Sequence, residues 1–234
     1  MVSLIKLLVK DFVTLVYPPH CIECNQQIPI REKLFCTNCQ NIVGYTDHFE
    51  VANNDLIKRI GPRINPEHGA ALMNYIKEGA VQNAIHKLKY SGRFDIGIQL
   101  GVLFGEAYLS SEIFEKADVI IPIPIHKSRL RKREYNQSEM FANGISSATG
   151  IKIDTKLLVK NKYMLSQTQK GRADRFDTVL NTFKVENRVL YKNKRLLLID
   201  DVLTTGATIE AAFSLLEKIP GVKIQLGLIA LASN

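Results

Sequence analysis

The sequence predicts an α/β protein built on a parallel sheet flanked by helices, with a small zinc-binding module near the N-terminus. Three observations support this fold class. Leu196 to Ile199 form an unbroken apolar run, which is typical of a strand buried on both faces of a parallel sheet. Residues 119–125 contain a second run of this kind. All four cysteines fall within residues 21–39, in two C-x-x-C motifs that are typical of a zinc site.

Composition and net charge limit the classes of function that this chain can have. A chain of 234 residues that is 46% hydrophobic can bury the core of one main domain plus an appendage. Its net charge of +8 favours anionic partners, either phosphorylated small molecules or nucleic acid. The apolar stretch at residues 2–17 contains Lys6, Lys10 and Asp11, so it is too short and too charged to span a bilayer. It has no signal-peptide cleavage pattern, so we expect a cytoplasmic protein without a transmembrane segment.

The first element is this stretch at residues 2–17, whose spacing indicates a short amphipathic helix docked on the body of the protein. Attachment to a membrane surface is the less favoured alternative. The cysteine module follows, and its paired motifs allow four thiolates to converge tetrahedrally on one Zn²⁺: Cys21, Cys24, Cys36 and Cys39. The intervening segment has no core-sized apolar stripe, so the metal would supply much of the module's folding energy. His20 adjoins the first cysteine and is expected to be a bystander.

The cysteine spacing leaves two alternatives to zinc open. A pair of disulfides is disfavoured because no secretion signal precedes the module. An iron–sulfur site is also possible, although the spacing is less usual for one.

The chain divides into three predicted parts: residues 1–45 with the helix and the cysteine module, a connecting or hood region at 46–90, and the main domain at 91–234. Residues 46–69 look irregular, because Asn-Asn, Gly-Pro and Asn-Pro pairs punctuate them.

From residue 70 onward the pattern becomes regular. Residues 70–76 are compatible with a strand, and the apolar spacing of 80–90 indicates a helix that ends at Ser91-Gly92. A further helix is predicted at roughly 95–110.

The next strand, residues 119–125, carries Pro122 and Pro124 near its end, where the missing N–H groups do least harm. Five cations follow within seven residues: Lys127, Arg129, Arg131, Lys132 and Arg133. A helix is predicted from about Asn136. The cations face the crevice at the carboxyl edge of the sheet, although such charge runs are often only solvated surface.

The most informative string is RLLLIDDVLTTGAT, residues 195–208. Its acids and its Thr/Gly-rich turn lie between a strand and an amphipathic helix, where open α/β sheets bind ligands and helix amides favour phosphate. Gly206 permits a tight turn, and Thr208 can cap the helix. Asp200 and Asp201 would repel a phosphate, so they suit neutral hydroxyls or a divalent cation. Phosphate and hydroxyl sites one sugar-length apart describe a ribose 5-phosphate.

This string resembles the phosphoribosyl-pyrophosphate (PRPP) motif of type I phosphoribosyltransferases. The resemblance implies that Asp200 and Asp201 hold the ribose hydroxyls, while the loop that holds the 5-phosphate comprises Thr204, Thr205, Gly206, Ala207 and Thr208. It also implies Mg²⁺ with the bound PRPP, and a pyrophosphate held by cations such as Lys127 and Arg129. The alternative without a ligand is an ordinary strand–turn–helix, whose Asp and Thr residues only cap the helix and contact solvent.

The order of the motifs sharpens the match. A Pro-Pro-x-Cys start, the four-cysteine module, LKY-x-G-R at residues 88–93, P-I-P-x-H at 122–126, and R-x-Y-N-Q before a helix together resemble the ComF family of competence-associated proteins. The family resemblance covers nearly the whole chain and implies a role in DNA uptake, with single-stranded DNA and uptake-machinery proteins as partners. The basic residues that would bind nucleic acid are Arg131, Lys132 and Arg133, with Tyr90 or Tyr135 offering a stacking ring.

In type I transferases a mobile loop shields the reacting carbon from water. The polar segment 161–176 is the candidate for that lid, with Lys170, Arg172 and Arg175 reaching over the pyrophosphate, and a plain exposed loop is the alternative. Asp200, Asp201 and Arg172 are therefore the candidate catalytic residues. Asp177-Thr178 stands where the family resemblance implies an Arg-x-x-Asn run.

Two functions follow: a PRPP-binding protein that handles DNA, or an active transferase that passes phosphoribosyl to a nitrogen nucleophile.

Overall fold

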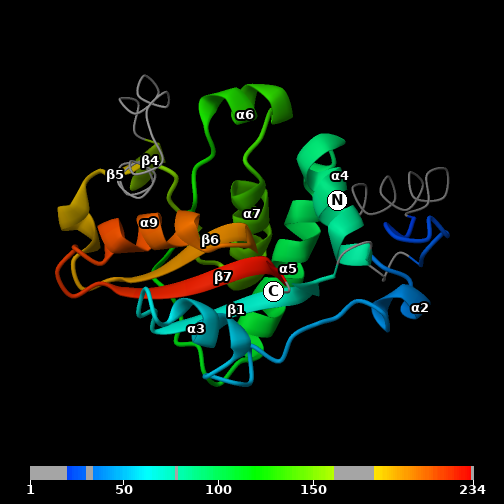
Figure 1. Cartoon of the computed structure of the whole chain (residues 1–234), viewed down its shortest axis with the longest axis horizontal. Helices are drawn as coiled ribbons and strands as arrows, with labels where there is room; N and C mark the ends of the chain where they lie inside the picture. The colour runs from blue at the N-terminus through cyan, green and yellow to red at the C-terminus, as the bar shows by residue number, and fades with distance from the viewer. Residues whose placement is uncertain (1–19, 30–33, 77–78, 161–181, 233–234) are drawn as a thin grey trace, which may run out of the picture.

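The computed structural model of the chain describes residues 20–29, 34–76, 79–160 and 182–232. Its centre is a five-stranded parallel sheet in the order β1-β7-β6-β2-β3 (Figure 1). The strands are β1 (His68–Tyr75), β2 (Val119–Pro122), β3 (Lys152–Ile153), β6 (Arg195–Leu203) and β7 (Lys223–Ala232). The prediction of a parallel α/β sheet flanked by helices is confirmed.

Two separate cores lie on the two faces of this sheet, and β6 contributes to both. Leu197 and Ile199 pack in the core that contains α4 (Ala80–Tyr90), α5 (Phe94–Ser110) and α7 (Gln137–Thr149). Leu196 and Leu198 point to the other face, where α3 (Asp55–Ile60) and α9 (Ala207–Leu216) cover the sheet (Figure 1). The run from 196 to 199 is apolar throughout because alternate side chains of a strand enter opposite cores.

Helices α5 and α7 cross at very short range because glycine residues lie at their contact. A Cβ atom at Gly101 would lie 2.1 Å from the carbonyl oxygen of Phe141, and one at Gly144 would lie 2.0 Å from that of Ile98. Only glycine fits at both positions, because these distances are far below a van der Waals contact. The crossing sets the position of α7, whose N-terminus reaches the carboxyl edge of the sheet.

Helix α3 lies in residues 46–69, so the prediction that this whole segment is irregular was wrong. The Asn54 side chain caps α3 by accepting a hydrogen bond from Ile57 N, and it donates to the carbonyls of Val51 and Gly69. Strand β1, from the predicted connecting region 46–90, pairs with β7 in the main sheet. The boundaries at 45 and 90 themselves stay predictions.

The cysteine module contains the short helix α2 (Thr37–Gln40), and the chain that leaves it runs along the outer edge of β1. Tyr45 forms an antiparallel bridge with Met73, Asn74 N donates to Gly44 O at 2.7 Å, and Thr46 N donates to Leu72 O at 3.2 Å. This edge of the sheet is therefore partly paired along its length.

The remaining elements of the described residues stand outside the main sheet. They are α6 (Lys127–Arg133), the two-stranded antiparallel sheet of β4 (Leu158–Lys160) and β5 (Phe183–Val185), and the 3₁₀ helix η2 (Arg188–Tyr191). Within the described ranges, the helices are all too short or too polar to cross a membrane.

Candidate phosphoribosyl site and cysteine cluster

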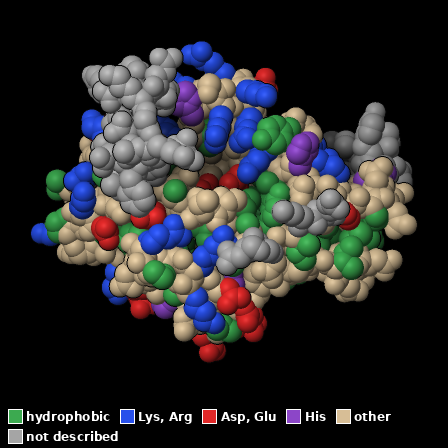
Figure 2. Space-filling model, in the orientation of Figure 1, with side chains coloured by type: hydrophobic (Ala, Val, Ile, Leu, Met, Phe, Trp, Pro, Cys, Tyr) green, Lys and Arg blue, Asp and Glu red, His purple; other side chains and the backbone are tan. Residues whose placement is uncertain are grey.

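A cleft of about 590 Å³ opens at the carboxyl ends of β2 and β6, beside the N-termini of α7 and α9. Figure 2 shows acidic side chains at the bottom of a hollow that Lys and Arg side chains surround. Several predicted residues line this cleft, and so do two lysines without a predicted role: Asp200, Asp201, Thr204, Thr208, Arg129, Arg133, Lys89 and Lys160. Five of the nine residues predicted to bind PRPP therefore line the cleft, whereas Thr205, Gly206, Ala207 and Lys127 do not.

The two acids at the end of β6 have different surroundings. Asp200 Oδ1 accepts hydrogen bonds from Ser138 Oγ at 3.0 Å and from Asp201 N at 2.9 Å. Asp201 Oδ2 lies 2.7 Å from Lys89 Nζ. Burial, together with the neighbouring charge of Asp201, raises the pKa of Asp200 to about 7. In the free protein the charge of Asp201 is balanced by Lys89, whereas that of Asp200 is disfavoured.

The loop from Thr204 to Thr208 turns sharply before α9. Gly206 has a φ of +82°, in the left-handed region that favours glycine, and it is the N-cap residue of α9. The expectation that Thr208 caps this helix was wrong, because α9 begins at Ala207 and Thr208 lies within its first turn. The N-terminus of α9 nevertheless lies beside the acids, which is the arrangement that favours a phosphate.

Two arginines from outside the predicted motif hold the back of this loop. Arg59 Nη2 donates to the carbonyl oxygen of Thr204, and Arg63 Nη1 donates to that of Thr205 at 2.7 Å. A Cβ atom at Gly206 would lie 2.7 Å from Arg63 Nη2, so a larger residue there would displace the guanidinium. Sequence reasoning missed both arginines.

The predicted cations divide into two groups. Arg129 and Arg133 line the cleft, whereas Lys127 is not part of its lining. Arg131 and Lys132 are exposed on α6 and also lie outside the lining. Arg133 is held in place, since its Nη1 donates to Gln137 Oε1 at 2.9 Å.

Lys160 and Gln137 add polar groups that the sequence did not single out. Burial and the nearby charge of Arg129 lower the pKa of Lys160 to about 8, and its ammonium lies 4.0 Å from the centre of the Phe183 ring. Gln137 is 1% exposed, and its Nε2 has no hydrogen-bond partner in the described part of the chain. A buried donor without a partner is costly, so a ligand acceptor in the cleft would satisfy it.

The four cysteine sulfurs converge on one point. They lie within 4.8 Å of one another, and Cys24 Sγ and Cys36 Sγ are 3.7 Å apart. Thiolates on a tetrahedral zinc ion are separated by about 3.8 Å, given Zn–S bonds of about 2.3 Å. All four cysteines are described and none forms a disulfide. Burial and the neighbouring thiols raise the pKa of Cys39, whereas backbone hydrogen bonds outweigh burial at Cys21 and lower its pKa to about 6.

The module contacts the site through α4. Lys87 Nζ donates to the carbonyl oxygen of Ile22 at 2.6 Å, and Asn83 Nδ2 donates to Glu23 Oε2 at 3.0 Å. Lys89, in the same helix, reaches Asp201. One helix therefore touches both the cysteine module and the acids.

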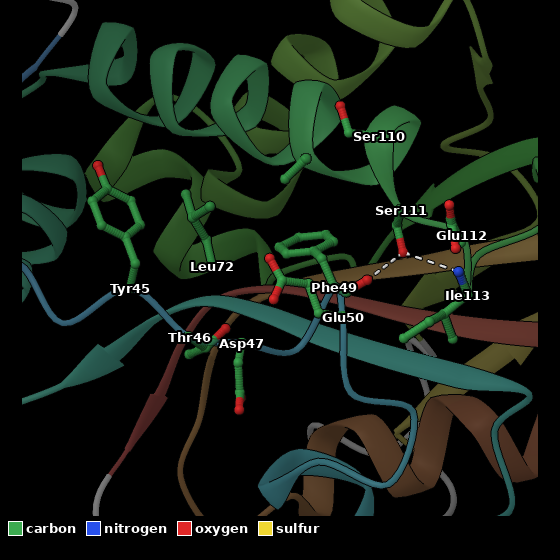
Figure 3. A pocket seen from close by; sticks show the side chains of 11 residues that line it. Tyr45, Thr46, Asp47, Phe49, Glu50, Leu72, Ser110, Ser111, Glu112 and Ile113 are labelled. Carbon is green, nitrogen blue, oxygen red and sulfur yellow. Dashed lines mark hydrogen bonds between the residues drawn. The ribbon is translucent and has the colours of Figure 1, made fainter.

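A second cavity, of about 510 Å³, shares no lining residue with the cleft (Figure 3). Its floor includes Phe49 and Leu72, and three carboxylates stand around it, those of Asp47, Glu50 and Glu112. A sugar phosphate would be repelled there, so this cavity does not compete with the cleft as a site for an anionic ligand.

Some predicted features lie outside the described residues. They are the helix at residues 2–17 and the candidate lid at 161–176 with Lys170, Arg172 and Arg175.

Comparison with known proteins supports the class that the cleft suggests. The model of the phosphoribosyl transferase domain matches residues 106–233, just over half of the chain. The chain therefore belongs to the phosphoribosyl transferase domain family. Together with the four-cysteine cluster, its curated relatives make it a ComF-type member of that family.

Two of these relatives are named competence proteins. Competence protein F of Haemophilus influenzae is 24% identical over 217 residues, which cover 88% of this chain and 94% of that protein. Competence protein ComFC of Streptococcus pneumoniae is 35% identical over 127 residues, 54% of each chain. Among solved structures, glutamine PRPP amidotransferase from B. subtilis, complexed with ADP and GMP, is 21% identical with a TM-score of 0.43. That match covers 62% of this chain and 30% of the other.

Proposed function

We propose that this protein binds PRPP in the cleft at the carboxyl ends of β2 and β6. One observation carries the proposal: two acids near the carboxyl end of β6 stand a short loop before a left-handed glycine and the N-terminus of α9, in a cleft lined by cations. Asp200 and Asp201 hold the ribose hydroxyls, and the loop Thr204–Thr208 holds the 5-phosphate. The pyrophosphate lies toward Arg129, which lines the cleft, and Lys127 at the start of α6 adds positive charge.

Mg²⁺ accompanies the pyrophosphate in this proposal, and the oxygen-rich set of Asp200 and Asp201 suits it. When bound, Mg²⁺ neutralises charge on the departing pyrophosphate. Lys89 must then yield part of its contact with Asp201. The chain's own residues orient the sugar: Ser138 fixes the Asp200 carboxylate, and Arg59 and Arg63 fix the loop backbone.

The ribose assignment is tested with the double variant Asp200→Asn, Asp201→Asn. We expect it to remain folded and to lose Mg²⁺-dependent PRPP binding in calorimetry, because the acceptors for the hydroxyls and the ion are weakened. Asp55→Asn, at an exposed carboxylate on α3, is the matched control and keeps the affinity. Unchanged PRPP affinity in the double variant would refute the assignment.

One further measurement distinguishes transfer of the phosphoribosyl group from binding of PRPP alone. Pyrophosphate release from Mg-PRPP is followed with a panel of nitrogenous bases, glutamine and single-stranded DNA as acceptors. Release with one acceptor identifies an active transferase, in which Arg172 is the third candidate catalytic residue. PRPP binding without release from any of them identifies a binding or sensing role.

A role in DNA uptake is the finer proposal, and the names of the two competence proteins support it. We place the protein in the cytoplasm, acting on single-stranded DNA with proteins of the uptake machinery. The exposed cations Arg131 and Lys132 on α6, next to Arg133, supply the electrostatic surface.

The variant Arg131→Ser, Lys132→Ser leaves the cleft lining intact and is the cleaner test of that surface. Its DNA affinity should fall and the salt dependence of binding should flatten. Arg133→Ser removes a residue that also holds Gln137, so it should affect PRPP binding as well. An unaltered salt slope in the double variant would count against this surface.

The cysteine cluster holds one structural Zn²⁺ in this proposal, because its sulfur spacing matches tetrahedral thiolate coordination. Metal analysis of protein purified without added zinc tests it. A zinc content well below one ion per chain would contradict the proposal.

A further inference from the structure

The second cavity is a groove with an apolar floor and an acidic rim. It lies between the segment at residues 45–50 and the last turn of α5, and Figure 3 shows Leu72 and Phe49 between Tyr45 and the end of that helix. Tyr45 is 43% exposed. The volume of about 510 Å³ lies in the range of sites that bind other molecules, and we call this cavity the acidic groove.

Three features give the acidic groove a negative potential. The carboxylates of Asp47, Glu50 and Glu112 stand around it, and none of them forms an ion pair with a described Lys or Arg. No described Lys or Arg lines the groove. Helix α5 ends here without a basic residue in its last turn, so its dipole adds partial negative charge. The groove therefore favours an occupant that is cationic as well as apolar.

Helix α6 has the complementary chemistry and little support from the rest of the fold. None of its seven residues is buried. Leu130 is 42% exposed, its neighbours in the chain are Arg129 and Arg131, and Lys127 lies one turn earlier on the same face of the helix. Seven residues are too few for a helix to be stable through its own hydrogen bonds, so packing against another molecule would stabilise α6.

The acidic groove and α6 lie at opposite ends of α5. Arg133 of α6 lies over the ring of Tyr90, just before α5 begins, whereas the last residues of α5 line the groove. A helix of 17 residues spans about 25 Å, so α6 cannot fill the groove of its own copy. In Figure 1, α6 stands at the top of the molecule and α3, which follows the segment 45–50, at the bottom.

We propose that α6 of one copy of this chain docks in the acidic groove of a second copy. Leu130 rests on the apolar floor, and the cations beside it face the carboxylates of the rim. Binding of a helix in an apolar groove is a common mode of protein recognition. The net charge of +8 repels two copies at long range, so the attraction comes from a local patch of opposite sign, which the groove provides.

Each junction of this kind needs a groove from one copy and a helix from the other, so the two contacting surfaces are different. Helix α6 also carries Arg129 and Arg133 of the cleft lining, so each junction lies beside the cleft of one copy. The inference does not depend on PRPP binding, and its test needs no PRPP.

The test uses the full chain and two variants. The groove variant, Glu50→Gln with Glu112→Gln, neutralises two of the three carboxylates. The α6 variant, Leu130→Ser with Arg131→Ser, removes the exposed apolar side chain and one cation. All four side chains are exposed or line the groove, and thermal melting shows that each variant is folded.

Each variant has a matched control elsewhere on the surface. Asp55→Asn with Glu217→Gln neutralises two other exposed carboxylates. Arg188→Ser with Val189→Ser changes an exposed arginine and its exposed apolar neighbour in η2. The controls therefore make the same changes of charge and apolar surface outside the proposed junction.

Sedimentation velocity over a series of protein concentrations is the measurement, at about 50 mM and at about 0.5 M salt. We expect the average mass of the wild-type protein to rise with concentration at the lower salt and to fall toward that of one chain at the higher salt. The groove variant and the α6 variant should each weaken the association by about tenfold or more, whereas both controls should keep it. An equimolar mixture of the two variants should recover association, because one supplies an intact helix and the other an intact groove.

The proposal is overturned if the wild-type protein sediments as a single chain at every concentration. It is also overturned if the α6 variant associates as the wild-type protein does, because the groove would then have a different occupant. Failure of the mixture to recover association would likewise contradict it, since a contact between two identical surfaces gives that result. Failure of the protein to bind PRPP would sink the proposed function and leave each of these readouts unchanged.

Discussion

The chain before the matched domain and the matched domain itself build the cleft in different ways. Residues 106–232 supply most of the cleft lining, including the acids of β6, Thr204 and Thr208 around the start of α9, and Arg129 and Arg133 of α6. The described residues up to 90 supply mainly supports: Lys89 on Asp201, and Arg59 and Arg63 behind the loop. The matched region therefore supplies most of the cleft lining, while the preceding region supplies side chains that pair with it and hold its loop.

Removing the metal from the cysteine module should break this division most strongly. Cys21→Ser with Cys24→Ser removes two of the four sulfurs proposed to hold Zn²⁺, and we expect a loss of roughly 5 kcal/mol or more from the free energy of unfolding of the module, because metal binding would supply its folding energy. Thermal melting and metal content are the measurements. Gln27→Ala, at an exposed position in the same module, should change neither. Unaltered PRPP affinity in the cysteine variant would show that the module does not support the site.

Within the matched domain, Asp200→Asn should stabilise the free protein at high pH. The folded-state pKa of Asp200, about 7, lies above its ordinary value of 3.8, so its charge costs stability progressively as the pH rises from about 4 to 7. Asn keeps an oxygen to accept the bonds from Ser138 and Asp201 N. We expect a gain of up to about 4 kcal/mol at pH 8 and almost none at pH 4. Equal gains in urea unfolding at both pH values would contradict this expectation.

Lys89→Met tests the support that crosses between the two regions. The ion pair with Asp201 is largely shielded from water, and its loss leaves an unbalanced carboxylate beside Asp200, so we expect a destabilisation of about 1–2 kcal/mol. The loss should shrink when Asp201→Asn is also present, which a double-mutant cycle measures. Lys132→Met, on exposed α6, is the control. Additive effects of the two changes would show that the pair contributes nothing.

Arg63→Gln should have the smallest effect of these changes, and its effect is on PRPP affinity. It removes a charge and a hydrogen bond to the Thr205 carbonyl, behind the loop rather than in the cleft, so PRPP affinity should fall by roughly fivefold, or about 1 kcal/mol. Arg93→Gln removes an exposed arginine that does not line the cleft and should leave calorimetric affinity unchanged. An equal effect of both changes would mean that only net charge matters.

Elements with an uninterrupted pattern could be predicted from the sequence. The strand at 196–199 is apolar throughout because it feeds both cores, and the acids that follow it are adjacent in the chain, so their joint position needs no long-range information. The cysteine cluster could also be predicted, because the two residues of each C-x-x-C motif are close in the chain and only eleven residues separate the two motifs. Helix α3 was missed because six residues are too few for a helical period to show, and its cap, Asn54, stands in a segment that otherwise looks like a loop.

The supports of the site could not be predicted for a different reason. Arg63 and Thr205 are 142 residues apart in the chain, and nothing local to Arg63 indicates a contact with the loop. Lys89 stands in the LKY string but had no assigned role, because its partner Asp201 is known only once α4 is placed in the fold. Arg129 lines the cleft and Lys127 does not, because α6 points them in different directions. A run of charged residues in the sequence does not predict that helix.

The pairing of residues 44–46 with β1 has a consequence for solubility. An unpaired outer strand presents free N–H and C=O groups that template association with other chains. At one side of the sheet, β3 is only two residues long; at the other, the segment leaving the cysteine module covers part of β1. We therefore expect chelation of the metal to loosen this cover and to cause self-association, visible as rising light scattering before the main domain melts. With the proposed Zn²⁺ at the cysteine cluster, protection of this sheet edge would depend on metal binding.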